Sequence, residues 1–393
     1  MQNMPEKLTP KWTKKYRQPL CPRSNDQVVS NLPCDHAIND ILLLSLQARA
    51  ELVLGGGGAI FKQMFTHSYQ DIISMENLLV TWERFLRGKR HKNDVIKFQA
   101  NLNDNLVELY KELKNKTYIH DTYSAFNISD PKPRNIHKAT VRDRVVHHLL
   151  YKELYPYFEQ KFVYDSYSCR ENKGTHKALD RFKYFAGKVS KNHTKTCHVL
   201  KCDIKKFFAN IDHDTLKRIL ERHIKDKNIL WLLGQVINSF SFSKHIYAIA
   251  DMGKRGLPLG NLTSQLLVNV YMHEFDMYVK QELKVKYYIR YADDFVVLSQ
   301  DKKYLENLLV KFHNFLNDEL HLTLHENKVY IKTYTSGVDF LGWVHFPFHR
   351  QLRTTTKRKI VKNMKGYPKP ETINSYRGVL RHGDTYKFQK RIF

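Results

Sequence analysis

Three aspartates stand where a chain could present carboxylates to metal ions. Asp203 follows the apolar run that starts at Val199, and Asp293 and Asp294 separate two β-rich runs, 287–292 and 295–299. An Asp-Asp pair alone is common in turns, but a plain hairpin turn more often carries Gly or Asn. Mg²⁺ prefers carboxylates, water and substrate phosphates. Two such ions about 3.5–4 Å apart can activate an attacking hydroxyl and steady a leaving group in a phosphoryl displacement.

The pattern of apolar residues predicts the elements that would position these acids. Strands are expected at 199–204, 287–292 and 295–299, the last two as a hairpin, and helices over 76–118, 141–158 and 264–283. The Pro-, Lys- and Arg-rich segment 126–140 is expected to be extended. The segment Asp212-His213-Asp214 supplies candidate N-caps for a following helix. The segment Gly55–Gly58 lacks the Lys-Ser/Thr of a phosphate-binding loop and indicates a hinge or turn.

The composition indicates a globular protein with a polyanionic partner. Apolar residues make up 42% of the 393 residues, which excludes a disordered chain. A total of 65 Lys and Arg against 39 Asp and Glu gives a net charge of +26. Such an excess favours phosphates, because each one neutralised releases condensed counterions; a soluble protein with a basic surface is the alternative. No apolar run is long enough to span a membrane, so no membrane partner is expected.

The cysteines predict neither a zinc site nor a disulfide framework. The sequence has five of them, none in a C-x-x-C pair and none in a Cys/His spacing typical of zinc ligands. An odd count with no secretion signal favours a reducing cytoplasm.

Several segments resemble the conserved boxes of reverse transcriptases, in the family's order. Tyr291-Ala292-Asp293-Asp294 resembles the catalytic box, and Asp203 to Phe208 resembles the first carboxylate box. The other similar segments are Lys132 to Arg144 (fingers), Gly256 to Gln265 (before the long palm helix), and Leu322 to Lys328 with Val338 to Trp343 (end of the palm). The resemblance covers roughly residues 76–345 and is stronger than any one motif.

This resemblance implies an α+β right-hand polymerase. We expect an N-terminal extension at 1–75, fingers at 76–200, a palm with the catalytic carboxylates at 201–345 and a basic helical thumb at 346–393. The implied activity is RNA-directed DNA polymerisation, which copies a template RNA into cDNA from deoxynucleoside triphosphates. It would use two Mg²⁺ ions, for which Mn²⁺ can substitute. Template RNA and the RNA–DNA hybrid are the expected partners, in the cytoplasm of a bacterium or as a phage-encoded enzyme.

The same resemblance assigns roles to individual residues. Asp203, Asp293, Asp294 and the backbone carbonyl of Ile204 would face the metal ions. The residues implied in nucleotide binding are Lys132, Arg134, Arg142, Phe208, Leu259 and Gly260. Bidentate guanidinium groups suit the triphosphate, although Arg142 could instead pair with Asp143. Phe208 lies where the family carries an aromatic side chain that blocks a ribose 2′-hydroxyl; core packing is the alternative.

The end of the chain carries a concentrated positive charge. Thirteen Lys and Arg stand against two Asp and Glu from Arg350 to Phe393. The cations expected on one side of a helix are Lys357, Arg358, Lys359, Lys362 and Lys365. They predict a thumb surface that grips the phosphates of an RNA–DNA hybrid, with a solvated charged face as the alternative.

The fourth box narrows the resemblance to a subgroup. Most reverse transcriptases carry Gln-Gly and Ser-Pro there, whereas this chain has Leu259-Gly260 and Ser264-Gln265. That departure resembles the error-prone polymerases of diversity-generating retroelements, and Ser375 to His382 resembles their thumb end. Those enzymes work with a small basic accessory protein, so residues 1–75 and the outer fingers are candidate docking surfaces. The alternatives are a phage-defence or retron-like reverse transcriptase, and a non-catalytic nucleic-acid-binding protein with the same fold.

Overall fold

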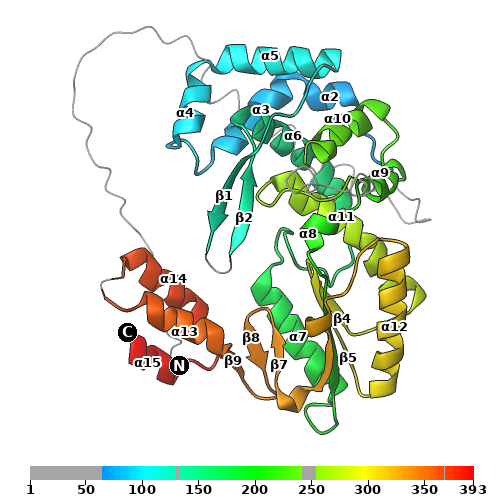
Figure 1. The fold of residues 1–393 in the computed structure, drawn as a ribbon, viewed down its shortest axis with the longest axis vertical. Helices are drawn as coiled ribbons and strands as arrows, with labels where there is room; N and C mark the ends of the chain where they lie inside the picture. Colours follow the sequence, from blue (N-terminus) through cyan, green and yellow to red (C-terminus); the bar gives the residue numbers. More distant parts are fainter. Residues whose placement is uncertain (1–63, 130–132, 241–253, 367) are drawn as a thin grey trace, which may run out of the picture. The chain divides into compact units, whose positions relative to one another are not determined.

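The computed structural model describes residues 64–129, 133–240, 254–366 and 368–393 (Figure 1). The chain divides into two units, 1–63 and 64–393, and every described residue belongs to the second. Lys132, Gly55–Gly58 and nearly all of the predicted N-terminal extension lie outside the described residues. No described helix is long and apolar enough to cross a membrane.

Helices dominate the first part of this unit. They are α2 (Tyr69–Ile73), α3 (Met75–Leu86), α4 (Asn93–Ala100), α5 (Leu102–Asn115) and α6 (Val141–Glu159). The structure thus divides the helical segment predicted over 76–118 into three. Gly88, just after α3, has a φ of 68°, which a glycine adopts without strain. The break lets α4 bury Val95 separately from the Leu106, Leu109 and Leu113 stripe of α5.

A two-stranded hairpin comes after these helices. Strands β1 (Ser124–Ile128) and β2 (Arg134–Lys138) pair antiparallel, with Ile128 opposite Arg134. This confirms the extended segment predicted over 126–140. The helix predicted over 141–158 is also confirmed: it is α6, and the Thr140 hydroxyl caps it by accepting from the backbone N–H of Asp143.

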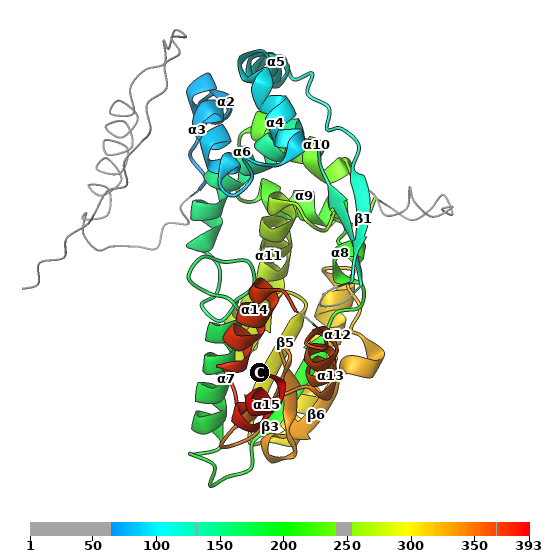
Figure 2. The same ribbon diagram turned by 90° about the vertical axis from the view of Figure 1, so that its left-hand side faces the viewer.

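The central sheet has four antiparallel strands in the order β4-β5-β3-β6. They are β3 (His198–Asp203), β4 (Tyr288–Tyr291), β5 (Asp294–Ser299) and β6 (Tyr330–Thr333). Helix α7 (Thr175–Val189) packs on one face of the sheet, and α11 (Leu262–Met277) and α12 (Lys302–Asp318) pack on the other (Figures 1 and 2). Successive side chains of β3 point to opposite faces of the sheet. Val199 packs on the face covered by α7, and Leu200 and Cys202 pack on the other face. All three predicted strands are therefore confirmed.

Short helices lie between β3 and α11. In the described part of this connection they are α8 (Phe207–Asn210), α9 (His213–Glu221) and α10 (Lys227–Asn238). Of the predicted N-cap candidates, Asp212 caps α9, because its carboxylate accepts from the Thr215 N–H at 2.9 Å, whereas Asp214 lies in the first turn of the helix. The helix predicted over 264–283 corresponds to α11 and a π-helical turn at Tyr278–Glu282.

The C-terminal part combines a small sheet with helices. Strands β7 (Val338–Phe340), β8 (Trp343–His345) and β9 (Arg350–Leu352) form an antiparallel sheet, and α13 (Thr354–Asn363), α14 (Pro370–Leu380) and α15 (Tyr386–Ile392) come after it. Ile360 of α13 and Leu380 of α14 are buried in the same cluster as α7. The three helices lie side by side in Figure 2.

Candidate active site

The sheet brings the three predicted carboxylates together from two distant segments. Asp203, at the end of β3, lies directly opposite Asp294, the first residue of β5. Tyr291 pairs with Asp294, so Ala292 and Asp293 form the two-residue turn between β4 and β5. Ala292 has a φ of 54°, the left-handed conformation that such tight turns require. The Ile204 N–H donates to the Asp293 carbonyl at 3.1 Å, which ties this turn to the end of β3.

Burial and mutual repulsion disfavour the charged forms of Asp293 and Asp294. Burial raises the pKa of Asp294 to about 7, against the favourable charge of Lys201 and with a further rise from Asp203 and Asp293. Burial also raises the pKa of Asp293, and the negative charge of Asp203 adds to that rise. A bound cation would relieve both the repulsion and the cost of burying charge.

Lysine ammonium groups neutralise two of the three carboxylates. Lys201 Nζ lies 3.1 Å from Asp294 Oδ1, and Lys328 Nζ lies 2.8 Å from Asp203 Oδ1. The Lys201 side chain is 7% exposed, whereas that of Lys328 is 47% exposed and can therefore leave its partner. These two ammonium groups therefore occupy carboxylates that a metal cation would also bind.

The donor set fits hard divalent cations that also bind substrate. No group of three His, Cys, Asp or Glu side chains within the described ranges is close enough to hold a metal ion alone. Mg²⁺ commonly binds one or two carboxylates and completes its shell with water and substrate phosphates. Asp203 and Asp293 would supply such carboxylates, with Asp294 and the Ile204 carbonyl beside them.

A buried arginine, Arg290, contacts the turn between β4 and β5. The sequence pattern did not predict this role. Arg290 of β4 is fully buried and forms an ion pair with Asp276 of α11, Nη2 to Oδ2 at 2.6 Å. Its Nη1 group donates to the Ala292 carbonyl at 3.2 Å and to Asn269 Oδ1 at 3.3 Å. Nη2 also donates to the Ser166 hydroxyl at 3.2 Å. In the sequence, Arg290 is a single arginine within a predicted apolar strand. That pattern does not show which acidic residue it pairs with.

Phe208 lies shortly after the first carboxylate strand. It belongs to α8 and is half-buried, with its ring edge-on to Phe207 at 5.5 Å between centroids. Its carbonyl accepts from the Leu257 N–H at 2.8 Å. The ring is partly packed against the core and partly accessible, so both predicted roles, sugar gate and packing residue, stay open.

The Leu259-Gly260 segment docks against the β1–β2 hairpin. The His137 N–H of β2 donates to the Leu259 carbonyl at 2.9 Å. Gly260 has a φ of 113°, and a Cβ added there would lie 2.8 Å from Ile136 Cγ2. Glycine is therefore required for this close approach. Leu259 itself is half-buried, so part of its side chain is accessible.

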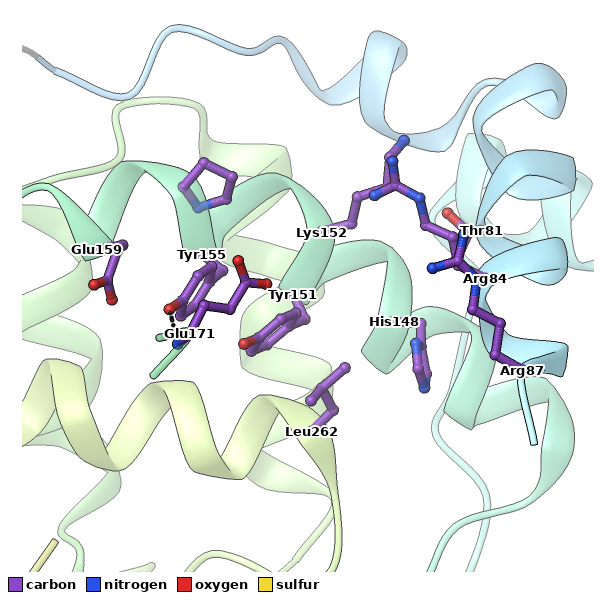
Figure 3. A pocket seen from close by; sticks show the side chains of 11 residues that line it. Thr81, Arg84, Arg87, His148, Tyr151, Lys152, Tyr155, Glu159, Glu171 and Leu262 are labelled. Atoms are coloured by element: carbon purple, nitrogen blue, oxygen red, sulfur yellow. Dashed lines mark hydrogen bonds between the residues drawn. The ribbon is translucent and has the colours of Figure 1, made fainter. Parts of the chain in front are cut away.

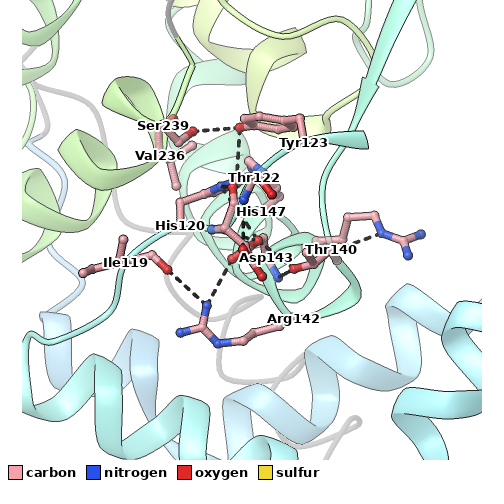
Figure 4. Close-up of polar contacts among 12 residues, drawn as sticks. Ile119, His120, Thr122, Tyr123, Thr140, Arg142, Asp143, His147, Val236 and Ser239 are labelled. Atoms are coloured by element: carbon pink, nitrogen blue, oxygen red, sulfur yellow. Dashed lines mark hydrogen bonds and ion pairs between the residues drawn. The ribbon is translucent and has the colours of Figure 1, made fainter. Parts of the chain in front are cut away.

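The two described arginines of the fingers box have different surroundings. Arg142 pairs with Glu112, donates to the Ile119 carbonyl at 3.2 Å and lies 3.3 Å from Asp143 Oδ1 (Figure 4). The contact with Asp143 that the sequence left as an alternative is therefore present. Arg134, at the start of β2, is exposed. Of the two, Arg134 is better placed to receive a ligand.

A chain of polar contacts joins the region before β1 to α11. His147 of α6 contacts His120 at 3.1 Å (Figure 4) and the Thr263 hydroxyl of α11 at 2.6 Å. Tyr123 links His120 to Ser239 through contacts of 3.2 and 2.7 Å. Burial lowers the pKa of His147 well below its usual value, so this histidine is uncharged within the chain of contacts.

The predicted basic residues of the C-terminal region lie on and just after α13. Arg358, Lys362 and Lys365 are exposed, whereas Lys357 and Lys359 are half-buried, and Ile360 faces the core. Helix α13 therefore has one buried position and four cations among its other nine residues. These residues belong to an element separate from the carboxylate sheet.

Comparison with known proteins identifies the family. Residues 128–345 match the family model described as reverse transcriptase (RNA-dependent DNA polymerase). The chain belongs to the reverse transcriptase family. This assignment confirms the predicted α+β right-hand fold and the predicted class of enzyme, an RNA-directed DNA polymerase.

Relatives of this reverse transcriptase include bacterial and intron-encoded proteins. It is 24% identical over 278 residues to the protein YkfC of Escherichia coli, covering 63% of this chain and 70% of YkfC. It is 27% identical over 187 residues to the group II intron-encoded protein LtrA of Lactococcus lactis, covering 47% of this chain and 29% of LtrA. A telomerase structure from Candida albicans, in complex with a fragment of telomeric RNA, is 13% identical. It covers 62% of this chain and 46% of the telomerase chain, with a TM-score of 0.46.

Proposed function

We propose that this reverse transcriptase copies an RNA template into cDNA by two-metal nucleotidyl transfer at Asp203, Asp293 and Asp294. The observation that carries the proposal is the pairing of Asp203 with Asp294 beside the turn that bears Asp293. Carboxylates held together at the ends of buried strands are costly unless they bind cations. The family to which the chain belongs is described as RNA-dependent DNA polymerase, which is consistent with an RNA template here.

The residues of the chain would hold two Mg²⁺ ions, or Mn²⁺ in their place. Bound there, the ions would lower the pKa of a primer hydroxyl and neutralise charge on a leaving pyrophosphate. Lys201 keeps Asp294 paired within the sheet. Lys328 is exposed enough to leave Asp203 and turn toward an incoming phosphate. Arg134 and Phe208 would contact the triphosphate and the sugar of a deoxynucleotide.

The test is primer extension on an RNA template. Asp293→Asn keeps the size of the side chain and removes its charge, so extension should fall by several orders of magnitude. Asp214→Asn is the matched control, because Asp214 is 82% exposed on α9 and should leave extension unchanged. Template binding should survive in both variants. Near-normal extension by Asp293→Asn would contradict the assignment.

We also propose that the enzyme is the error-prone polymerase of a diversity-generating retroelement, acting in a bacterial cytoplasm with a small basic accessory protein. Leu259 supports this proposal, because an apolar side chain cannot hydrogen-bond to an incoming nucleotide. The backbone around it is fixed by the contact with His137 and by the close approach of Gly260 to β2. The error spectrum of the purified enzyme, compared with that of Leu259→Gln, tests the proposal.

A further inference from the structure

A cavity of about 560 Å³ opens between α3 and α6, away from the carboxylate sheet. Its lining includes Arg84, Arg87, Tyr151, Lys152, Tyr155 and Glu171, and none of its lining residues belongs to β3, β4 or β5 (Figure 3). The volume lies within the range typical of small-ligand sites. Nothing in the nucleotidyl-transfer proposal uses this cavity.

Opposite charges lie at its two ends. Figure 3 shows Arg84, Arg87 and Lys152 at one end and Glu159 and Glu171 at the other. Two of these charges are already neutralised: Lys152 pairs with Glu153 at 3.0 Å, and Arg170 pairs with Glu159 at 2.8 Å. In the described part of the chain, neither Arg84 nor Arg87 is in an ion pair, and neither is Glu171. Among the described residues, the cavity therefore offers two unpaired guanidinium groups at one end and one unpaired carboxylate at the other.

Aromatic rings lie between these two ends. Tyr151 and Tyr155 stack with their centroids 4.9 Å apart and their planes 18° apart. The Tyr155 hydroxyl accepts from the Glu171 N–H at 2.6 Å, which fixes that ring in place, whereas Tyr151 is half-buried and less constrained. His148 lies near Tyr151, and burial lowers its pKa to about 4, so it adds a neutral ring at neutral pH.

A buried hydroxyl beside the cavity lacks a hydrogen-bond partner among the described residues. Thr81 lines the cavity and is only 1% exposed, and its Oγ1 makes no hydrogen bond to the described chain. A buried hydroxyl without a hydrogen bond costs roughly 1–3 kcal/mol. The Thr81 hydroxyl oxygen has almost no accessible surface, so a ligand in the cavity reaches it only if the Thr81 side chain turns toward the cavity.

We propose that this cavity binds one unpaired nucleotide of a single-stranded nucleic acid. The phosphate lies against Arg84 and Arg87, which suit it as planar donors. The base stacks on Tyr151, since every base has a face that an aromatic ring can cover. Glu171 accepts from an exocyclic amino group, as acidic side chains do with cytosine. Uracil and thymine have no such group, so the site disfavours them.

Photocrosslinking tests where the strand lies. A short oligocytidine that carries 5-iodocytidine is irradiated with the full-length protein, in one RNA arm and one DNA arm, and adducts are located by mass spectrometry. Adducts on Tyr151 or Tyr155 are expected, and Tyr151→Ala should lose them. A result in the RNA arm, the DNA arm or both supports the site and identifies the strand it takes. Adducts confined to residues outside α3 and α6 in both arms would overturn the proposal.

Affinity measurements with matched variants test the chemistry. Arg84→Ala with Arg87→Ala should weaken oligocytidine binding about tenfold and lower the salt slope by about 0.7 units, the contribution of one phosphate neutralised on a single strand. Lys302→Ala with Lys303→Ala removes the same charge from the exposed side of α12 and is the control; an equal effect would overturn the proposal. Tyr151→Ala should weaken binding roughly tenfold, and Tyr151→Phe, which keeps the ring, should not.

Base preference and catalysis separate this site from the polymerase centre. Glu171→Gln should reduce the preference for oligocytidine over oligouridine, whereas equal affinities for both in the unaltered protein would contradict the role of Glu171. Extension of a primer on a template too short to reach the cavity should stay unchanged in all these variants. The site can therefore fail this test while the polymerase assignment stands.

Discussion

Arg290 and Asp276 form a bidentate ion pair in the core, Nε to Oδ1 at 2.8 Å and Nη2 to Oδ2 at 2.6 Å. Both side chains are essentially inaccessible to solvent. Arg290 also donates to the Ala292 carbonyl, so it connects α11 to the turn that carries Asp293. A buried ion pair contributes little more to stability than well-packed apolar residues of similar volume would. The contact between Arg290 and the turn that carries Asp293 is therefore the feature that bears on function.

Breaking this pair should affect stability and catalysis separately. Arg290→Gln leaves Asp276 buried without its countercharge and should cost about 3–5 kcal/mol of unfolding free energy. Adding Asp276→Asn removes that charge and should recover much of the stability, as measured by denaturant unfolding. Primer extension should stay low in the double variant, because the Ala292 carbonyl still lacks its guanidinium donor. Full recovery of extension along with stability would show that the pair has only a structural role.

The raised pKa of Asp294 predicts how stability depends on pH. In the folded protein this carboxyl keeps its proton up to a pKa of about 7, whereas its ordinary value is 3.8. Its contribution to stability is therefore fully present below about pH 4 and is lost as pH rises through about 7. Metal-free protein should lose melting temperature across that window, and Mg²⁺ should restore it at the upper end. Asp294→Asn should make the melting temperature depend less on pH. If the melting temperature of this variant falls with pH as in the unaltered protein, other titrating groups cause the fall.

The position of Phe208 predicts the choice of sugar. If its ring blocks a 2′-hydroxyl, Phe208→Ala should admit ribonucleotides with a modest loss of deoxynucleotide use. Competition between the two sugars in one extension assay measures this. Phe207→Ala is the control, because Phe207 is buried beside it and should lower stability without changing selectivity. Unchanged selectivity with reduced stability in Phe208→Ala would make Phe208 a packing residue.

The exposed cations of the C-terminal region predict a salt effect. Replacing Arg358, Lys362 and Lys365 with Ala should weaken binding to an RNA–DNA hybrid. The salt dependence should flatten by about 0.9 units of slope for each phosphate that the protein no longer neutralises. Binding titrations between low and moderate salt measure this. An unchanged slope would show that these side chains are solvated.

Leu259 predicts the error spectrum. Gln at this position in most reverse transcriptases can hydrogen-bond near the incoming nucleotide, and Leu cannot. The difference in activation free energy between incorporating a correct and an incorrect nucleotide should therefore narrow. A loss of about 1.4 kcal/mol reduces discrimination tenfold. By resemblance to the retroelement polymerases, we expect errors mainly opposite template adenine, and fewer of them in Leu259→Gln. Deep sequencing of cDNA from a mixed-base RNA template measures both. A flat spectrum that Leu259→Gln leaves unchanged would contradict the retroelement proposal alone.

The sequence by itself determined the elements around the carboxylates. Strands β3, β4 and β5 are short apolar runs, helix α6 carries closely spaced apolar residues, and the Asp212 cap is a local contact. Each of these signals lies within a few residues, where propensity and alternation act directly. The helix boundaries within 76–118 could not be predicted, because the helical pattern of apolar residues continues across the break between helices. The position of the break depends on how α4 and α5 pack in the tertiary structure.

Only the tertiary structure decided which side chains meet. The important ion pairs join different elements of the structure. They are Lys201 with Asp294, Lys328 with Asp203, Arg290 with Asp276, and Arg142 with Glu112. Helix α7 lies within the segment predicted as fingers, yet it packs on the four-stranded sheet that carries the carboxylates. The cavity between α3 and α6 likewise combines residues from separate helices. Local sequence pattern specifies which face of an element is apolar, but the partner of a charged or aromatic side chain depends on how distant segments pack together.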